Sequence, residues 1–243
     1  MDYMSDMLIF YIGYYMMGMY NLMILLMSLM STLFVNLFVT IEIDPCIWLK
    51  KKITLISFGI MAYLWLSLWL SWSGWIGWWV ICCIGGFIMA DFMSGFFHWV
   101  GDTVGLYTDF FLFVHFRIHH QNQTNLYLHN FWSLVYDIAM LSVVPMVCVR
   151  SLWLYFMCSF LVFANITHQY SHLPVGKVPG WIRWLQKWGL ILSPEMHKRH
   201  HVPPYKTTFC TLSGWCNIVD RIYLWHGLDR VVQSVVSFVD GIV

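Results

Sequence analysis

Long apolar segments separated by short polar ones occupy most of the first 167 residues. No charged residue interrupts Leu8–Ile41 or Ile53–Ala90. A membrane-spanning helix needs about 20 apolar residues, so the second segment is long enough for two spans. The Ser71–Gly74 stretch is the natural break between them. The pattern therefore predicts spans at about Ile53–Leu70 and Trp75–His98.

The first apolar segment is longer than one span requires. A helix over its whole length would measure roughly 50 Å, against a hydrocarbon core of about 30 Å. Gly13, Gly18 and Asn21 interrupt its first half. We therefore expect Leu8–Tyr20 to lie at the interface and Asn21–Ile41 to cross the membrane. The alternative is one tilted, overhanging span.

Two shorter apolar segments follow a polar stretch that runs from Val100 to His129. They are Phe131–Val149 and Leu152–Thr167, and Arg150-Ser151 separates them. Both are marginal in length, and we expect them to form a hairpin of two spans. The pattern as a whole predicts an all-α fold, a polytopic membrane helical bundle of four to five spans.

The positive-inside rule orients these spans. Lys50, Lys51 and Lys52 precede the Ile53 span and mark its inner end. Each pair of spans then crosses out and back, so the polar stretch and everything after His168 are inside as well. All eleven histidines are therefore expected on one membrane face, where they could form a shared metal-binding cap.

Composition supports the membrane assignment. Hydrophobic residues make up 60% of the 243 residues and charged residues only 10%, whereas a soluble domain carries about 25% charged residues. The formal net charge of +1 provides no basic surface for nucleic acid. We therefore exclude an ordinary soluble enzyme, a disordered chain and a nucleic-acid partner. The seven cysteines, odd in number and without a CxxC pair, are interpreted as small hydrophobic residues.

The histidines cluster at spacings that place imidazoles on one helix face. The clusters are His115, His119 and His120; His168 and His172; and His197, His200 and His201; His98 and His129 stand alone between the clusters and the spans. Two or three such helices facing one another could hold two metal ions, and imidazole suits iron, zinc and copper. HExxH is absent, which disfavours a zinc protease. A bis-histidine haem would leave most of these residues unexplained, and His226 is interpreted as an ordinary histidine.

Two carboxylates accompany the cluster. Asp91, His98 and Asp102 are spaced i, i+7 and i+11, which is one helical face if the span continues through Asp102. A carboxylate within an apolar span is costly and usually functional. Asp91 and Asp102 are therefore candidate catalytic residues that orient a histidine ligand or bind metal. The alternative is a capping or pairing carboxylate near the interface. Gly95 on the same helix would let another backbone approach.

The chain carries several spaced motifs: Ala90-Asp91-Phe92-Met93-Ser94-Gly95, His98-Trp99, Asp102-Thr103, Phe116-Arg117-Ile118-His119-His120, Asn165, His168, Ser171-His172, His197, His200-His201, Thr208-Phe209-Cys210 and Gly214-Trp215-Cys216-Asn217. Together these motifs resemble those of the plasmanylethanolamine desaturase (Kua) family of lipid desaturases. The resemblance covers roughly residues 81–220. It implies a membrane non-haem di-iron enzyme that uses O₂ and electrons from a donor protein such as cytochrome b5 to desaturate a membrane phospholipid.

The resemblance also implies a set of metal ligands. These are His98, His119, His120, His129, His168, His172, His197, His200 and His201. Two positions depart from the family pattern: Asn130 stands where the family has Asp, and Met196 where it has a further His. Iron is the expected metal, with zinc or no metal as alternatives. The family favours the endoplasmic reticulum membrane.

We expect three regions: an N-terminal hydrophobic extension (1–45), a lipid-desaturase-like domain (46–225) and a C-terminal tail (226–243). A second hypothesis is that the chain is a desaturase-like supernumerary subunit of a larger membrane complex. Such a complex could be respiratory, which would place the chain in the mitochondrial inner membrane. The N-terminal extension would then serve as a docking helix.

Overall fold

The structure, a computed structural model, describes residues 46–71, 75–103, 120 and 130–240, with side chains as far as 237. This part of the chain is all-helical and contains no strand, which confirms the expected fold class. The expected segments Leu8–Tyr20 and Asn21–Ile41 lie outside it. The helices are α2 (Ile47–Leu70), α3 (Ile76–Thr103), α5 (Phe131–Cys148), α6 (Leu152–Leu161), α7 (Ala164–His172), η3 (Val175–Lys177), α8 (Gly180–Lys187), α9 (Pro194–His200), η4 (Trp215–Ile222) and α10 (Leu224–Asp240).

Helices α2, α3 and α5 are long and apolar enough to cross a membrane, with 24, 28 and 18 residues. Each overlaps an expected span, although α2 begins before Ile53 and α3 continues beyond His98 to Thr103. At the start of α2, Lys50 and Lys51 lie over the rings of Tyr136 and Trp132 on α5. The first residues of α2 and α5 therefore lie at the same end of the bundle, where cations can also meet lipid headgroups.

The second half of the expected hairpin is broken. Helix α6 has ten residues and ends at Leu161, and α7 begins at Ala164. At the break, the amide of Phe163 donates to Phe160 and that of Ile166 to Phe163, three residues back rather than four. These tighter turns redirect the chain, and α6 alone is too short to cross a bilayer. The count of four to five spans is therefore not confirmed, since three helices of the described residues are long enough.

The spans pack through large aromatic and small residues. Trp65 on α2 meets the rings of Tyr155 and Phe156 on α6 at 5.5 and 4.8 Å, and its Nε1 donates to Ser159 Oγ at 2.9 Å. On α3, a Cβ at Gly86 would lie 2.6 Å from Phe156 Cβ. A side chain at this glycine would therefore separate α3 from α6.

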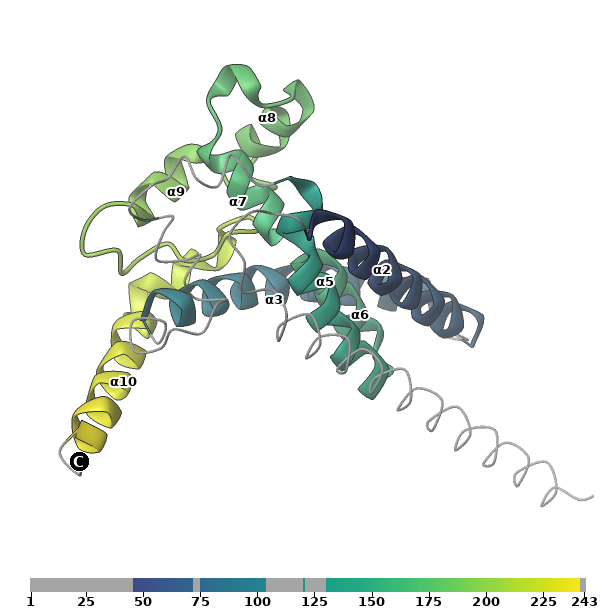
Figure 1. Cartoon of the computed structure of the whole chain (residues 1–243), viewed down its shortest axis with the longest axis horizontal. Helices are drawn as coiled ribbons and strands as arrows, with labels where there is room; N and C mark the ends of the chain where they lie inside the picture. The colour runs from purple at the N-terminus through teal and green to yellow at the C-terminus, as the bar shows by residue number, and fades with distance from the viewer. Residues whose placement is uncertain (1–45, 72–74, 104–119, 121–129, 241–243) are drawn as a thin grey trace, which may run out of the picture.

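The histidine-bearing segments gather at one end of these spans. Figure 1 shows α7, α8 and α9 together above the bundle, while α10 extends from near the end of α3. Trp225 of α10 is buried against Trp99 of α3, and Asp229 accepts from Trp99 Nε1 at 2.8 Å. The expected domain boundary at residue 225 falls within α10, and this contact ties both sides of it to α3.

Candidate metal centre

Helices α7 and α9 present four histidines to one another. We call His168, His172, His197 and His201 the first histidine group; one ring nitrogen of each lies within 4.8 Å of the others. Both pairs are spaced i, i+4, so each helix directs two rings to the same side. The start of α9 is fixed by Ser193, whose Oγ accepts from the amide of Met196 at 3.2 Å.

Hydrogen bonds cannot satisfy the nitrogens of this group. His197 Nε2 lies 2.8 Å from His168 Nε2, 2.8 Å from His172 Nε2 and 3.0 Å from His201 Nε2. An imidazole nitrogen has one proton or one lone pair, so it can make one good hydrogen bond and not three. A cation at the centre would accept all four lone pairs. The spacings approach the roughly 3.3 Å between tetrahedral ligands bonded at about 2.0–2.1 Å.

The environment keeps these rings neutral, as metal ligands must be. Burial lowers the pKa of His172 to about 4 and that of His201 to about 3, with neighbouring histidines adding to the effect. Burial also holds the pKa of His197 well below its ordinary value. All three therefore carry an available lone pair at neutral pH.

A second group combines histidine with a carboxylate. We call His98, Asp102, His120 and His200 the histidine–aspartate group. Asp102 Oδ2 lies 3.0 Å from His120 Nε2, 3.2 Å from His200 Nε2 and 3.5 Å from His98 Nε2. Both Asp102 oxygens are buried and accept no hydrogen bond from the described residues. A buried carboxylate facing three imidazole nitrogens fits a divalent cation better than it fits water.

Two backbone carbonyls orient the rings of this second group. His98 Nδ1 lies 3.1 Å from the oxygen of Phe209, and His200 Nδ1 lies 2.8 Å from that of Thr207. A carbonyl oxygen can only accept, so Nδ1 of both rings carries the proton. Their Nε2 lone pairs are then left for a metal, as in most protein metal sites.

The two groups lie side by side and both take residues from α9. Helix α9 contributes His197 to the first and His200 to the second, and its C-cap residue His201 belongs to the first. Across the boundary, the His98 and His168 ring centres are 5.1 Å apart and those of His197 and His200 are 5.6 Å apart. The arrangement fits two metal ions held close together by seven imidazoles and one carboxylate.

Asp91 has another place in the structure. It is fully buried, and its Oδ1 accepts from the amides of Ser213 and Gly214 at 2.7 and 2.9 Å, while Oδ2 accepts from the amide of Cys216 at 2.8 Å. The carboxylate thus holds the chain that follows Phe209 against α3. Asp91 therefore lies outside both groups and acts on the segment that carries the two orienting carbonyls.

The same segment is fixed at further points. Ser94 Oγ accepts from the amide of Thr211 at 2.9 Å, and Thr167 Oγ1 donates to the carbonyl of Thr211 at 2.6 Å. A Cβ on Gly95 would lie 2.5 Å from Cys210 Sγ and 3.1 Å from Cys210 N, so the glycine permits the close approach that the sequence suggested. Residues 207–216 are thereby clamped between α3 and α7.

Eight of the expected site residues are brought together in the two groups. They are His98, Asp102, His120, His168, His172, His197, His200 and His201. His119 and His129 lie outside the described residues, as does His115. The carbonyls of Thr207 and Phe209 were missed because a backbone acceptor leaves no mark in a sequence, although the Thr208-Phe209-Cys210 motif lies at this place.

The two departures from the family pattern have local roles. Asn130 caps α5, its Oδ1 accepting from the amide of Ser133 at 3.1 Å. Met196 faces Gly214 and Asn217 and lies outside both groups. Neither four-residue group therefore includes position 130 or 196.

These features define a class: a membrane protein of apolar helices with a histidine-rich candidate centre for two metal ions at one end of its spans. Comparison with known families then identifies the family. The family model described as the lipid desaturase domain matches residues 87–239, more than half of the chain. The chain belongs to the lipid desaturase family, as its motifs indicated.

Relatives of known name are moderately similar. A mouse protein named plasmanylethanolamine desaturase 1 is 29% identical over 178 residues, 64% of this chain and 65% of the relative. A Myxococcus xanthus protein named plasmanylethanolamine desaturase is 32% identical over 150 residues, 54% of this chain and 52% of the relative. Arabidopsis thaliana chloroplastic fatty acid desaturase 4 is 27% identical over 158 residues, 60% of this chain and 49% of the relative. The matches thus span about half to two-thirds of these relatives, and no solved structure matches the chain.

Proposed function

We propose that the protein is an O₂-dependent desaturase that introduces a double bond into a hydrocarbon chain of a membrane phospholipid, with two iron ions in the two groups. The observation that supports this most is the pair of adjacent four-residue groups, whose donor atoms cannot be satisfied by hydrogen bonds alone. The desaturase names of the relatives support the reaction class.

The reaction requires an electron donor. Removing two hydrogens from neighbouring methylenes while reducing one O₂ to two waters consumes two further electrons and two protons. We expect a donor protein such as cytochrome b5 to supply the electrons. Bound iron would supply the activation of O₂ that an unactivated C–H bond demands.

The residues of this chain prepare the site for that chemistry. The Thr207 and Phe209 carbonyls hold His200 and His98 in the tautomer that presents Nε2. Asp102 would add a negative charge that offsets part of the charge of a bound metal. His98, His197 and His200 are at most 1% exposed, so these three rings are shielded from bulk water.

The family resemblance supports the endoplasmic reticulum membrane as the location. The alternative, a desaturase-like subunit of a respiratory complex in the mitochondrial inner membrane, would not require an intact metal centre. Metal content therefore separates the two hypotheses more directly than location does.

The test measures iron per purified chain and the unsaturated lipid it forms. We expect about two irons per chain, one for each group. His197→Ala removes the nitrogen at the centre of the first histidine group, so iron should fall to about one per chain or less, and product formation by about 100-fold or more. His226→Ala, a matched histidine outside both groups, should change neither.

An iron-free chain, purified under conditions that preserve such centres, would overturn the proposal and favour the subunit hypothesis. A His197→Ala variant with full iron and full activity would equally contradict the assignment of the first histidine group.

A further inference from the structure

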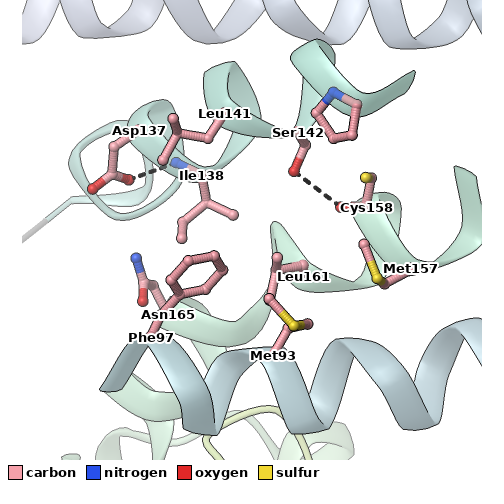
Figure 2. Close-up of a pocket in the computed structure, with 11 residues that line it drawn as sticks. Met93, Phe97, Asp137, Ile138, Leu141, Ser142, Met157, Cys158, Leu161 and Asn165 are labelled. Carbon is pink, nitrogen blue, oxygen red and sulfur yellow. Dashed lines mark hydrogen bonds between the residues drawn. The ribbon is translucent and has the colours of Figure 1, made fainter. Parts of the chain in front are cut away.

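A cavity of about 250 Å³ lies between the helices. Its walls come from α3, α5, α6 and the start of α7 (Figure 2). Of the eleven residues that line it, three carry an oxygen or nitrogen in the side chain: Asp137, Ser142 and Asn165. The lining is therefore mostly apolar and suits a hydrocarbon guest.

The polar side chains divide the cavity into two ends. Figure 2 shows Asp137, Asn165 and Phe97 at one end and Ser142, Met157 and Cys158 at the other. Ser142 uses its hydroxyl within the protein, donating to the Cys158 carbonyl at 3.4 Å. The carboxylate of Asp137 thus makes one end polar, and the opposite end is effectively apolar.

The polar end is lined by residues that neighbour a member of each group along the chain. Phe97 directly precedes His98 on α3, and Asn165 comes three residues before His168 on α7. Asn165 is held there by its Nδ2, which donates to the Leu134 carbonyl at 2.9 Å. A molecule in the cavity would therefore have its polar end nearest the histidines.

One side of the cavity reaches the surface of the helices. Leu141 and Phe97, which line it, are 46% and 39% exposed, whereas Ser142 and Cys158 are 3% and 1% exposed. The exposed pair lies on α5 and α3, which are long and apolar enough to cross the membrane. The molecules that contact these surfaces in a bilayer are lipids.

We infer that this cavity binds one hydrocarbon chain of a membrane lipid, which enters from the side past Phe97 and Leu141. The polar attachment of the chain lies at the Asp137–Asn165 end, and its methyl end lies against Ser142 and Cys158. The assignment of this cavity as a substrate site rests on the proposed function, whereas the binding of a lipid chain in it does not.

The test uses phospholipids with a photoreactive diazirine on one acyl chain, mixed into nanodiscs that contain the full chain. We expect a diazirine near the methyl end to label Met157, Cys158 and their neighbours, and one near the ester to label the Phe97–Asn165 end. Labelled residues are identified by mass spectrometry, with and without metal, so that no turnover is needed.

Two variants narrow the cavity from opposite walls, Leu141→Trp on α5 and Met93→Trp on α3. Each should lower labelling at Cys158 by about tenfold, the effect of excluding roughly two methylenes. Leu141 is partly exposed, so its variant should still fold. Ile84→Trp adds the same ring to α3 at a residue that is 54% exposed and does not line the cavity, and should leave labelling unchanged.

Labelling confined to lipid-facing residues such as Ile84, or equal in all variants, overturns the inference. Reversed labelling by the two probes overturns the orientation. A protein that is labelled at Cys158 yet forms no double bond refutes the proposed function and leaves the chain site standing. A protein that forms the double bond although its cavity is never labelled refutes the chain site and leaves the proposed function standing.

Discussion

Asp91 shows how a carboxylate deep in an apolar helix can be satisfied without any cation. Its carboxylate accepts three hydrogen bonds from backbone amides of residues 213–216. A charged acceptor strengthens each bond relative to a neutral one. Asp91 therefore contacts neither the first histidine group nor the histidine–aspartate group. It supports them through the segment 207–216, which it holds against α3.

Replacing Asp91 with Asn tests this role. The amide NH₂ cannot accept, so at least one amide of the 213–216 segment loses its partner inside the protein. We expect a loss of about 2–4 kcal/mol in stability, measured as a lower thermal unfolding temperature in detergent, together with a lower metal content. Glu195→Gln makes the same chemical change at an exposed position in the first turn of α9 and should shift stability by less than about 1 kcal/mol. Equal stability of the two variants would show that these hydrogen bonds are dispensable.

The histidines themselves could be predicted at the residue scale because their spacing is local. His168 and His172, or His197 and His201, share a helix face whatever the rest of the fold does. The division of these residues into two groups could not be predicted, because it depends on which faces of α3, α7 and α9 meet. Asp91 and Asp102 were likewise indistinguishable as sequence, and only their neighbours separate their roles.

At the scale of elements, the approach of residues 207–216 to α3 depends on one missing side chain. Gly95→Ala would place a methyl group 2.5 Å from Cys210 Sγ and 3.2 Å from Cys210 Cα, and would displace the segment that ends in the Phe209 carbonyl. We expect a destabilisation of about 1–3 kcal/mol and weaker metal binding. Thermal unfolding measures the loss of stability, and elemental analysis measures the bound metal.

Gly59→Ala on α2 is the matched control, since nothing lies within 4 Å of its added methyl. Alanine is favoured over glycine within a helix by roughly 0.5–1 kcal/mol. The control should therefore be neutral or slightly stabilising. If Gly95→Ala behaved in the same way, the close contact would have no energetic importance.

The break between α6 and α7 could not be predicted from the sequence. The two residues at the break, Val162 and Phe163, are neither Pro nor Gly, and the apolar pattern continues through both. The chain turns here because α7 must face α9, as the contacts of His168 and His172 with His197 show. Such a requirement comes from another part of the chain, which a local pattern cannot reveal.

At the scale of the whole molecule, the two groups join segments that are distant in sequence. Metal ions would link the end of α3 to α7 and α9, while α2, α5, α6 and the first half of α3 hold together through an apolar core. We expect metal removal by a chelator to increase amide hydrogen exchange by about tenfold or more in 194–217. Exchange in α5 and α6 should stay the same. Uniform change along the chain would contradict this division, and restored protection on adding metal is the control.

The sharing of α9 between the groups has a consequence for how the centre is filled. With two ions bound as we propose, the first would fix α9, and with it His200 or His197 of the other group, so the second ion would meet a site that is already ordered. Loading would then be cooperative, and singly occupied chains would be scarce at equilibrium. When metal is short, the population would divide into complete and empty molecules, so supply would set the number of complete centres and not the quality of each one.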